Sequence, residues 1–191
     1  MLARSEPVTL RKLAAAAGTS TMAIYTHFGG MAGLWSAVRQ EGFIRLRRRL
    51  ELVAPSEDPV GHLMALGVAY VSNALANPHL YLTMFDARHD LEDPDAAAAT
   101  FGVLVAGAAR ARDEGRFDRA TEPEGAAIQL WGMAHGMVML VLTGALELDR
   151  LRVHFPAMSA AGFAGFGDDP QAAHASAAAG WAAFDRIAGV P

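Results

Sequence analysis

The sequence contains no cysteine among its 191 residues. That absence excludes disulfide bonds and thiolate metal sites, and it is typical of a chain that works in a reducing compartment. The N-terminus also lacks the charged start, apolar stretch and small-residue cleavage site of a secretory signal peptide. Together these absences predict a cytoplasmic protein without cysteine chemistry.

No segment shows the alternating apolar pattern and tight turns of paired β-strands, so we expect an all-α chain. Three Asp-Pro pairs, each a typical helix start, predict helices over residues 59–76, 94–114 and 170–188. The pairs are Asp58-Pro59, Asp93-Pro94 and Asp169-Pro170.

Two further signals predict helices between these starts. Asn77-Pro78 predicts a short helix over residues 78–87. Thr121, with Glu124 three residues later, has the spacing of a capping box and predicts a long helix that runs to about residue 147. Residues 148–168 are predicted to be a long connection, and connections of that length are usually functional or mobile.

The charge is unevenly placed along the chain. Residues 1–50 hold eight Lys/Arg and two Asp/Glu, a net charge of +6, whereas residues 51–191 hold eight Lys/Arg and eighteen Asp/Glu, a net charge of −10. A basic segment is what a polyanion-binding head needs, although two halves of a chain can also differ by chance. Four arginines lie close to the end of this basic segment, at Arg45 and residues 47–49. They either extend the positive field toward DNA or stabilise the C-terminus of a helix.

One uncharged run, Gly125–Leu146, is long enough for a membrane span. It also contains the polar residues Gln129, His135 and Thr143, and we expect no second span. We therefore expect a buried helix, and no membrane among the partners of the protein.

Near the N-terminus, two short helices are predicted around a tight turn. Thr9 can cap the first helix, which has an apolar face at Leu10, Leu13, Ala14 and Ala17. Gly18 then suits the left-handed residue that ends it. Thr19 or Ser20 can cap the second helix, over residues 21–28, whose Ile24 and Phe28 are expected to pack on the first. This is the helix-turn-helix plan, in which the second helix enters the major groove of DNA.

A family resemblance rests on this segment. The run LRKLAAAAGTSTMAIYTHF, followed by Leu34, resembles the DNA-binding segment of TetR-family transcriptional regulators. A second resemblance lies at residues 131–136, which look like the Trp-His-Gly signature of a C-terminal ligand-binding domain in part of that family. The resemblance implies a DNA-binding head, a regulatory body and a homodimer, with helices at about 121–147 and 170–188 making a four-helix contact.

The chain departs from the family pattern in two places. Residues 1–7 are too short for the first of the three helices of such a head, so we expect that helix to be missing. Many relatives carry a phosphate-contacting lysine where Met31 stands. The loss of one such contact should flatten the salt dependence of DNA binding by about one unit of slope.

The resemblance and the side-chain chemistry together suggest which head residues meet DNA. Tyr25 and His27 carry good hydrogen-bond donors for phosphate. Arg11 matches a position that reaches base edges in some relatives, and arginine is the usual reader of guanine. The remaining candidates for base contacts are Thr21, Met22 and Thr26.

His135 invites a metal or catalytic interpretation. Its helical neighbours are Trp131, Gly132, Val138 and Met139, none of which suits a metal site, and no nucleophile with a base accompanies it. A buried histidine held by a hydrogen bond is favoured, and a ligand-contacting role is the second possibility. Gly132 and Gly136 lie one turn apart and would allow close approach of another helix.

Aromatic and methionine residues spread over the predicted body helices are core residues by default, but a subset can line an apolar cavity between helices. The candidates for ligand contacts are Tyr81, Phe85, Phe101, Trp131 and His135.

The sequence therefore predicts an all-α protein with a helix-turn-helix head, residues 1–53, on a helical-bundle regulatory and dimerisation domain, residues 54–191. We expect a homodimeric regulator of the repressor type that binds double-stranded operator DNA and is released by a small hydrophobic effector. No cofactor, metal or catalytic residue is expected. The alternative is a helical ligand-binding or scaffold protein with a non-functional head.

Overall fold

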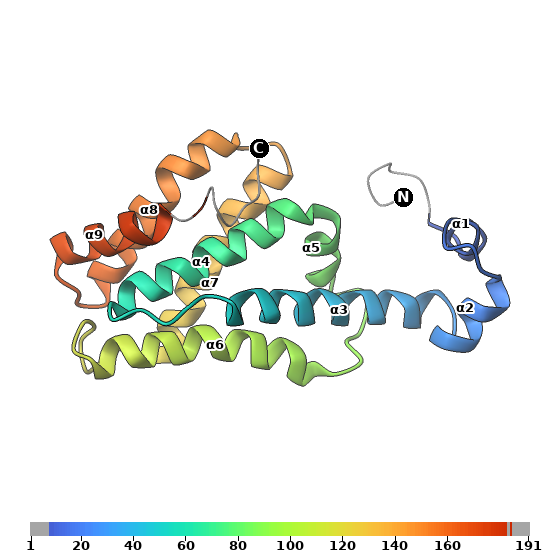
Figure 1. The fold of residues 1–191 in the computed structure, drawn as a ribbon, viewed down its shortest axis with the longest axis horizontal. Coiled ribbons are helices and arrows are strands. Elements are labelled where there is room, and N and C mark those ends of the chain that lie inside the picture. The colour runs from blue at the N-terminus through green and yellow to red at the C-terminus, as the bar shows by residue number, and fades with distance from the viewer. Residues whose placement is uncertain (1–7, 183, 185–191) are drawn as a thin grey trace.

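The computed structural model describes residues 8–182 and 184, and these residues form nine helices and no strand. Figure 1 shows a small head, α1 (Leu10–Ala16) and α2 (Thr21–Phe28), projecting from one end of a helical body. The long helix α3 (Met31–Glu51) joins the two, because its first turns pack on α2 and its later turns pack on the body. The all-α prediction is confirmed. The question of a further head helix falls on residues 1–7, outside the described residues.

The body is built around one central helix. It consists of α4 (Pro59–Ala76), α5 (Pro78–Met84), α6 (Pro94–Asp113), α7 (Pro123–Leu142), α8 (Leu148–Gly165) and α9 (Pro170–Trp181). Helix α4 packs against α3, α6, α7 and α9, and most of its side chains are buried. The three Asp-Pro starts are confirmed, since the Asp58, Asp93 and Asp169 carboxylates each accept a backbone N–H of their helix.

Helix α8 corrects the prediction that residues 148–168 form a connection. The Gly, Ala and Phe content of this segment suggested a connection, but the segment is helical as far as Gly165. Its buried residues Leu151, Phe155 and Phe163 recur at helical spacing, and α8 packs closely on α7 and α9. The burial of this apolar stripe offsets the hydrogen bond that Pro156 cannot make.

The predicted capping box before α7 is wrong. Glu122 is the N-cap residue and makes no side-chain capping hydrogen bond. The Thr121 hydroxyl instead donates to the carbonyl of Phe166, 3.0 Å away, and so ties the start of α7 to the end of α8.

Three predicted helix ends also move. Helix α7 ends at Leu142 and not near residue 147, because Gly144 adopts a left-handed conformation with φ +75°. Helix α5 ends at Met84, three residues before the expected residue 87. Helix α9 ends at Trp181, and most of the predicted extension to residue 188 lies outside the described residues.

Two of the described helices, α4 and α7, are long and apolar enough to cross a membrane. The core helix of a helical bundle can be equally long and apolar, and 67% of the apolar stretch of α4 is buried inside the structure. For α7 the buried share is only 33%. Helix α7 therefore leaves much of an apolar surface uncovered in the single chain.

An ion-pair network fixes three loops of the body at one end. The Arg116 guanidinium lies 2.7 Å from an Asp168 carboxylate oxygen and 2.6 Å from one of Asp58. The Ser176 hydroxyl donates to the other Asp58 oxygen across 2.6 Å. Burial alone would raise the pKa of Asp58, but this hydrogen bond, two backbone N–H groups and the Arg116 charge lower it overall. The start of α4, the loop after α6 and the α8–α9 corner are thereby held together.

Candidate functional site

The head is held by local hydrogen bonds that the sequence indicated. The Thr9 hydroxyl accepts from the backbone N–H of Lys12 at 3.4 Å, and the Ser20 hydroxyl accepts from that of Ala23 at 3.0 Å. Gly18 has φ +63°, the left-handed conformation expected between the helices. These caps fix where α1 ends and α2 begins, and so they set the angle of the helix pair.

The packing between α1 and α2 is confirmed only in part. Ala14 on α1 and Ile24 on α2 are buried, as an apolar contact requires. Phe28, expected to pack beside Ile24, is 38% exposed and lies at the last turn of α2, near the turn into α3. The head residues that the structure describes therefore bury few large side chains.

The outward side of α2 carries the residues expected to meet DNA. Met22 and Tyr25 are 71% and 59% exposed. At about 100° per residue, Met22 and Thr26 lie roughly opposite the buried Ile24, while Tyr25 and His27 lie on the two flanks, about 160° apart. A helix lying in a groove presents its centre to the bases and its flanks to the two phosphate backbones. This geometry suits the predicted roles.

The hydroxyl of Thr26 is engaged within its own helix, so the methyl group is the free part of this side chain. Its hydroxyl donates to the carbonyl of Met22 within α2, across 2.9 Å. Together with the exposed Met22 side chain, this makes the centre of the outward face apolar, which suits contact with thymine methyl groups. Thr21 is exposed on the same helix and Arg11 on α1, so all six predicted head residues are accessible.

The junction from α2 to α3 requires its glycines. Gly29 and Gly30 have φ values of +68° and +116°, which side-chain-bearing residues rarely adopt. A Cβ atom at Gly33 would collide with the backbone carbonyl of Phe28. The end of α2 therefore packs closely on the first turn of α3, where Met31 stands.

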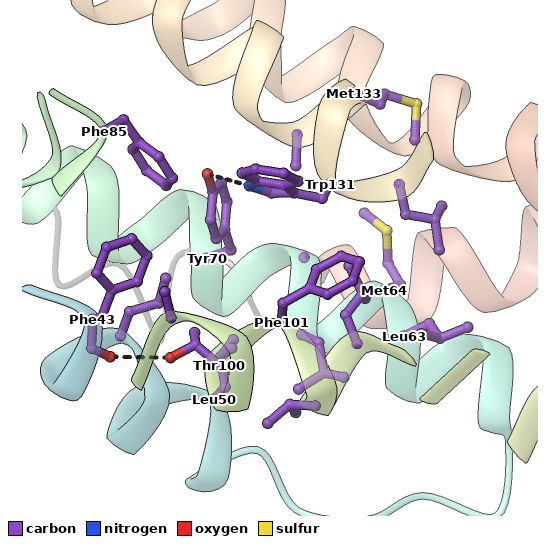
Figure 2. Close-up of a pocket in the computed structure, with 18 of the residues that line it drawn as sticks. Phe43, Leu50, Leu63, Met64, Tyr70, Phe85, Thr100, Phe101, Trp131 and Met133 are labelled. Atoms are coloured by element: carbon purple, nitrogen blue, oxygen red, sulfur yellow. Dashed lines mark hydrogen bonds between the residues drawn. The ribbon is translucent and has the colours of Figure 1, made fainter. Parts of the chain in front are cut away.

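The body contains an apolar cavity of about 420 Å³ between α3, α4, α6, α7 and α8. That volume is within the range of small-molecule sites. Figure 2 shows aromatic side chains around it, among them Phe43 of α3, Phe101 of α6, Trp131 of α7 and Phe85, which follows α5. Two lining hydroxyls are already used within their own helices, since Thr100 donates to the carbonyl of Ala96 and Ser159 to that of Phe155.

The five predicted ligand residues form one cluster. Phe85 is at its centre, with its ring centroid 5.0 Å from that of Tyr81, 4.6 Å from that of His135 and 6.1 Å from that of Trp131. Phe101 lies 6.0 Å from Trp131 on the far side. Phe85, Phe101 and Trp131 line the cavity directly, whereas the structure places Tyr81 and His135 behind its wall.

Tyr70 connects Tyr81 and His135 to the cavity. From the sequence, Tyr70 was expected only as a core residue. Trp131 Nε1 donates to the Tyr70 hydroxyl at 3.2 Å, the dashed line between these residues in Figure 2. The Tyr70 and Tyr81 hydroxyls are 2.6 Å apart, and that of Tyr81 lies 2.6 Å from Nδ1 of His135. His135 is thus held by hydrogen bonds, as predicted.

Burial sets the protonation of this network. It raises the pKa of Tyr70 to about 12 and that of Tyr81 further, and it lowers the pKa of His135. A neutral His135 accepts at Nδ1, so the hydrogen bonds can run in one direction, from Trp131 through Tyr70 and Tyr81 to His135. Each of these donors finds an acceptor next to the cavity.

Two comparisons with protein-family models decide the family. Residues 63–158, half of the chain, match the model described as "Tetracyclin repressor-like, C-terminal domain". Residues 6–38 match the model described as "Bacterial regulatory proteins, tetR family". The chain belongs to the TetR family. It is therefore a DNA-binding transcriptional regulator and not an enzyme, and operator DNA and a ligand are the partners that TetR membership implies.

Two solved structures share the fold of this TetR protein. One, described as a protein with unknown function from Rhodococcus sp. RHA1, is 25% identical, with a TM-score of 0.64 over 92% of this chain and 84% of its own. Another, the TetR family transcriptional regulator PfmR from Thermus thermophilus, is 22% identical, with a TM-score of 0.57 over 69% of this chain and 75% of its own. No curated protein matches the sequence.

Among the described residues of this TetR regulator, no group of three or more His, Asp or Glu side chains is placed to hold a metal ion. The helix-turn-helix pair of the family is α1 and α2. Sequence reasoning missed Arg39 of α3, which lines the cavity, although its place four residues before Phe43 on one helix face was a signal.

Proposed function

We propose that this protein is a homodimeric repressor that a small apolar effector releases from its operator. The observation that carries the proposal is the placement of two sites on one continuous helix. Helix α3 holds α2 at its start, and its later turns line the cavity with Phe43, Leu46 and Leu50. A ligand that moves α3 must therefore move α2.

For the head, we propose that Tyr25 and His27 contact phosphates on either side of the major groove. Arg11, Thr21, Met22 and Thr26 would then face the base edges. Their exposure and their arrangement around α2 support these roles. We place the boundary between DNA-binding and regulatory parts after residue 53, so that residues 1–53 carry the head and 54–191 the body. A protein that acts on operators works where the DNA is, which supports the cytoplasm as its location.

For the dimer, we propose a contact made by the exposed faces of α7 and α8. Ile128 and Leu140 on α7 and Val153 on α8 are large apolar side chains exposed in the single chain. A side chain at Gly132 or Gly136 would meet no atom within 4 Å, so folding of one chain does not require glycine there. Close approach of a second α7 explains both glycines. This choice replaces α9 by α8 in the contact expected from the sequence.

For the effector, we propose the cavity lined by Phe85, Phe101 and Trp131, with Tyr81 and His135 supporting its wall through Tyr70. Coupling between the sites must be reciprocal, so operator DNA must weaken effector binding by the same factor that effector weakens DNA binding. Trp131 would then belong to the effector wall and His135 would support it from behind.

Fluorescence anisotropy with a labelled duplex from the intergenic region beside the gene tests the proposal. We expect salt-sensitive binding, and higher transcription of the adjacent gene when the regulator gene is deleted. Absence of binding at low salt would favour the scaffold alternative. Lower transcription after deletion would contradict the repressor assignment.

A further inference from the structure

The cavity is apolar except at the end nearest the head. Among the described residues that line it, Arg39 is the only one with a charged side chain. Arg39 lies on α3 one turn before Phe43, and the α3 lining continues to Leu50. Eleven residues of helix correspond to about 16 Å, so the cavity is elongated, with its charge at one end.

The charge of Arg39 is not balanced by an acid. Its Nε donates to the carbonyl of Met84 at 3.0 Å, and Nη1 donates to the carbonyl of His89. Within the described chain no carboxylate forms an ion pair with it, and the nearby Asp86 is paired with Arg88 at 2.6 Å. A guanidinium has five N–H groups, so donors remain for a ligand.

The rest of the cavity favours an aromatic body. Phe43 and Phe85 meet edge to face, with centroids 5.8 Å apart, and Phe85 and Phe101 both pack on Trp131. Aromatic rings prefer such offset and edge contacts with one another. An elongated aryl group lying along α3 would replace solvent in the cavity and leave one end beside Arg39.

We propose that the effector is an elongated aryl carboxylate whose carboxylate binds Arg39. This inference rests on the proposed effector cavity. A carboxylate at that end takes bidentate hydrogen bonds from the guanidinium, the geometry that arginine favours. Binding there also acts on a side chain whose hydrogen bonds to the carbonyls of Met84 and His89 connect α3 to the end of α5 and the segment after it. The ligand thereby acts on the helix that holds the DNA-reading head.

Isothermal titration with three matched probes tests this choice: biphenyl-4-carboxylate, biphenyl-4-carboxamide and biphenyl-4-ylmethanamine. We expect the carboxylate to bind about tenfold or more tightly than the amide, the advantage of a charged hydrogen bond, and the amine to bind most weakly. Arg39→Gln should remove the preference for the carboxylate, and Arg39→Lys should retain part of it. Arg88→Gln is the control. Arg88 lies in the segment after α5 and its guanidinium is paired with Asp86, so this variant should leave the preference for the carboxylate unchanged.

The outcomes distinguish failure of the carboxylate inference from failure of the proposed effector cavity. Equal affinity for carboxylate and amide in the unaltered protein, or a preference that survives Arg39→Gln, overturns the carboxylate inference while the apolar effector cavity stands. Failure of all three probes to bind contradicts the effector cavity itself and the inference with it. The comparison of probes on the unaltered protein requires no variant to fold.

Discussion

The hydroxyl of Tyr81 lies 2.6 Å from Nδ1 of His135 and joins α5 to α7 behind the cavity wall. The Tyr81 side chain is fully buried, so its donor has no access to water. A neutral imidazole is the partner that this donor requires, and burial lowers the pKa of His135 from its ordinary value of 6.5. The arrangement makes the stability of the body depend on pH.

His135→Gln should weaken that pH dependence. Because the folded pKa is below the unfolded value, the stabilisation is complete above about pH 6.5 and is lost as the pH falls toward the folded pKa. Glutamine keeps an acceptor for Tyr81 but cannot titrate. His62, whose pKa is also lowered by burial, leaves a residual dependence in the variant. Urea unfolding at about pH 7.5 and about pH 5.5 measures the effect, and identical losses in both proteins would contradict it.

Arg116→Ala should destabilise the body strongly. The variant leaves Asp168, which is 5% exposed, buried without its ion-pair partner, and such a change typically costs about 3–5 kcal/mol of unfolding free energy. Arg45→Ala is the control, because its ion pair with Glu41 lies on the surface and should contribute about 0.5 kcal/mol or less. Chemical denaturation compares the two variants. Equal losses would show that the Arg116 network does not hold the three loops together.

Gly33→Ala should impair DNA binding while the body stays folded. Alanine in a helix is ordinarily favoured over glycine by about 1 kcal/mol, but here its Cβ would collide with the backbone carbonyl of Phe28. Helix α2 would have to move on α3. Gly102→Ala in α6 meets open space and serves as the control. Anisotropy titrations should show weaker operator binding for Gly33→Ala alone, and normal binding would argue against a fixed head angle.

Gly136→Arg should disrupt the proposed dimer and leave a monomer. The new side chain would project from the exposed face of α7 into the proposed contact between two copies, where it adds bulk and an unpaired charge. Gly102→Arg adds the same side chain to an open part of α6. Sedimentation at micromolar concentration should give a monomer for the first and a dimer for the second. A dimer in both cases would place the interface elsewhere.

The features predicted best from the sequence are the helix starts, which depend on residues close together in the chain. The caps at Thr9, Ser20 and Asp58 depend on atoms within three residues, so their composition and spacing were sufficient. Helix α8 was missed for the opposite reason. Pro156 weakens its local signal, and the helix is stabilised by packing on α7 and α9, which no local pattern reveals.

The cavity was likewise predicted where residue type was informative and missed where helix packing decides. The aromatic character of Phe85, Phe101 and Trp131 pointed to a ligand wall, and these residues do meet in space. That Tyr81 and His135 stand behind the wall, and that Arg39 reaches its head-proximal end, depends on how α3, α5 and α7 cross. Crossing angles follow from packing over the whole body and cannot be read from spacing on one helix.

The role of α2 is tested most directly by the affinity of Tyr25→Ala for the operator duplex, measured as a function of salt. The Tyr25 side chain is exposed and supports no core contact, so the variant should fold normally. We expect operator affinity to fall by about tenfold or more, as the loss of a hydrogen bond to a charged phosphate predicts. Unchanged affinity in a folded dimer would show that the outward face of α2 does not read DNA.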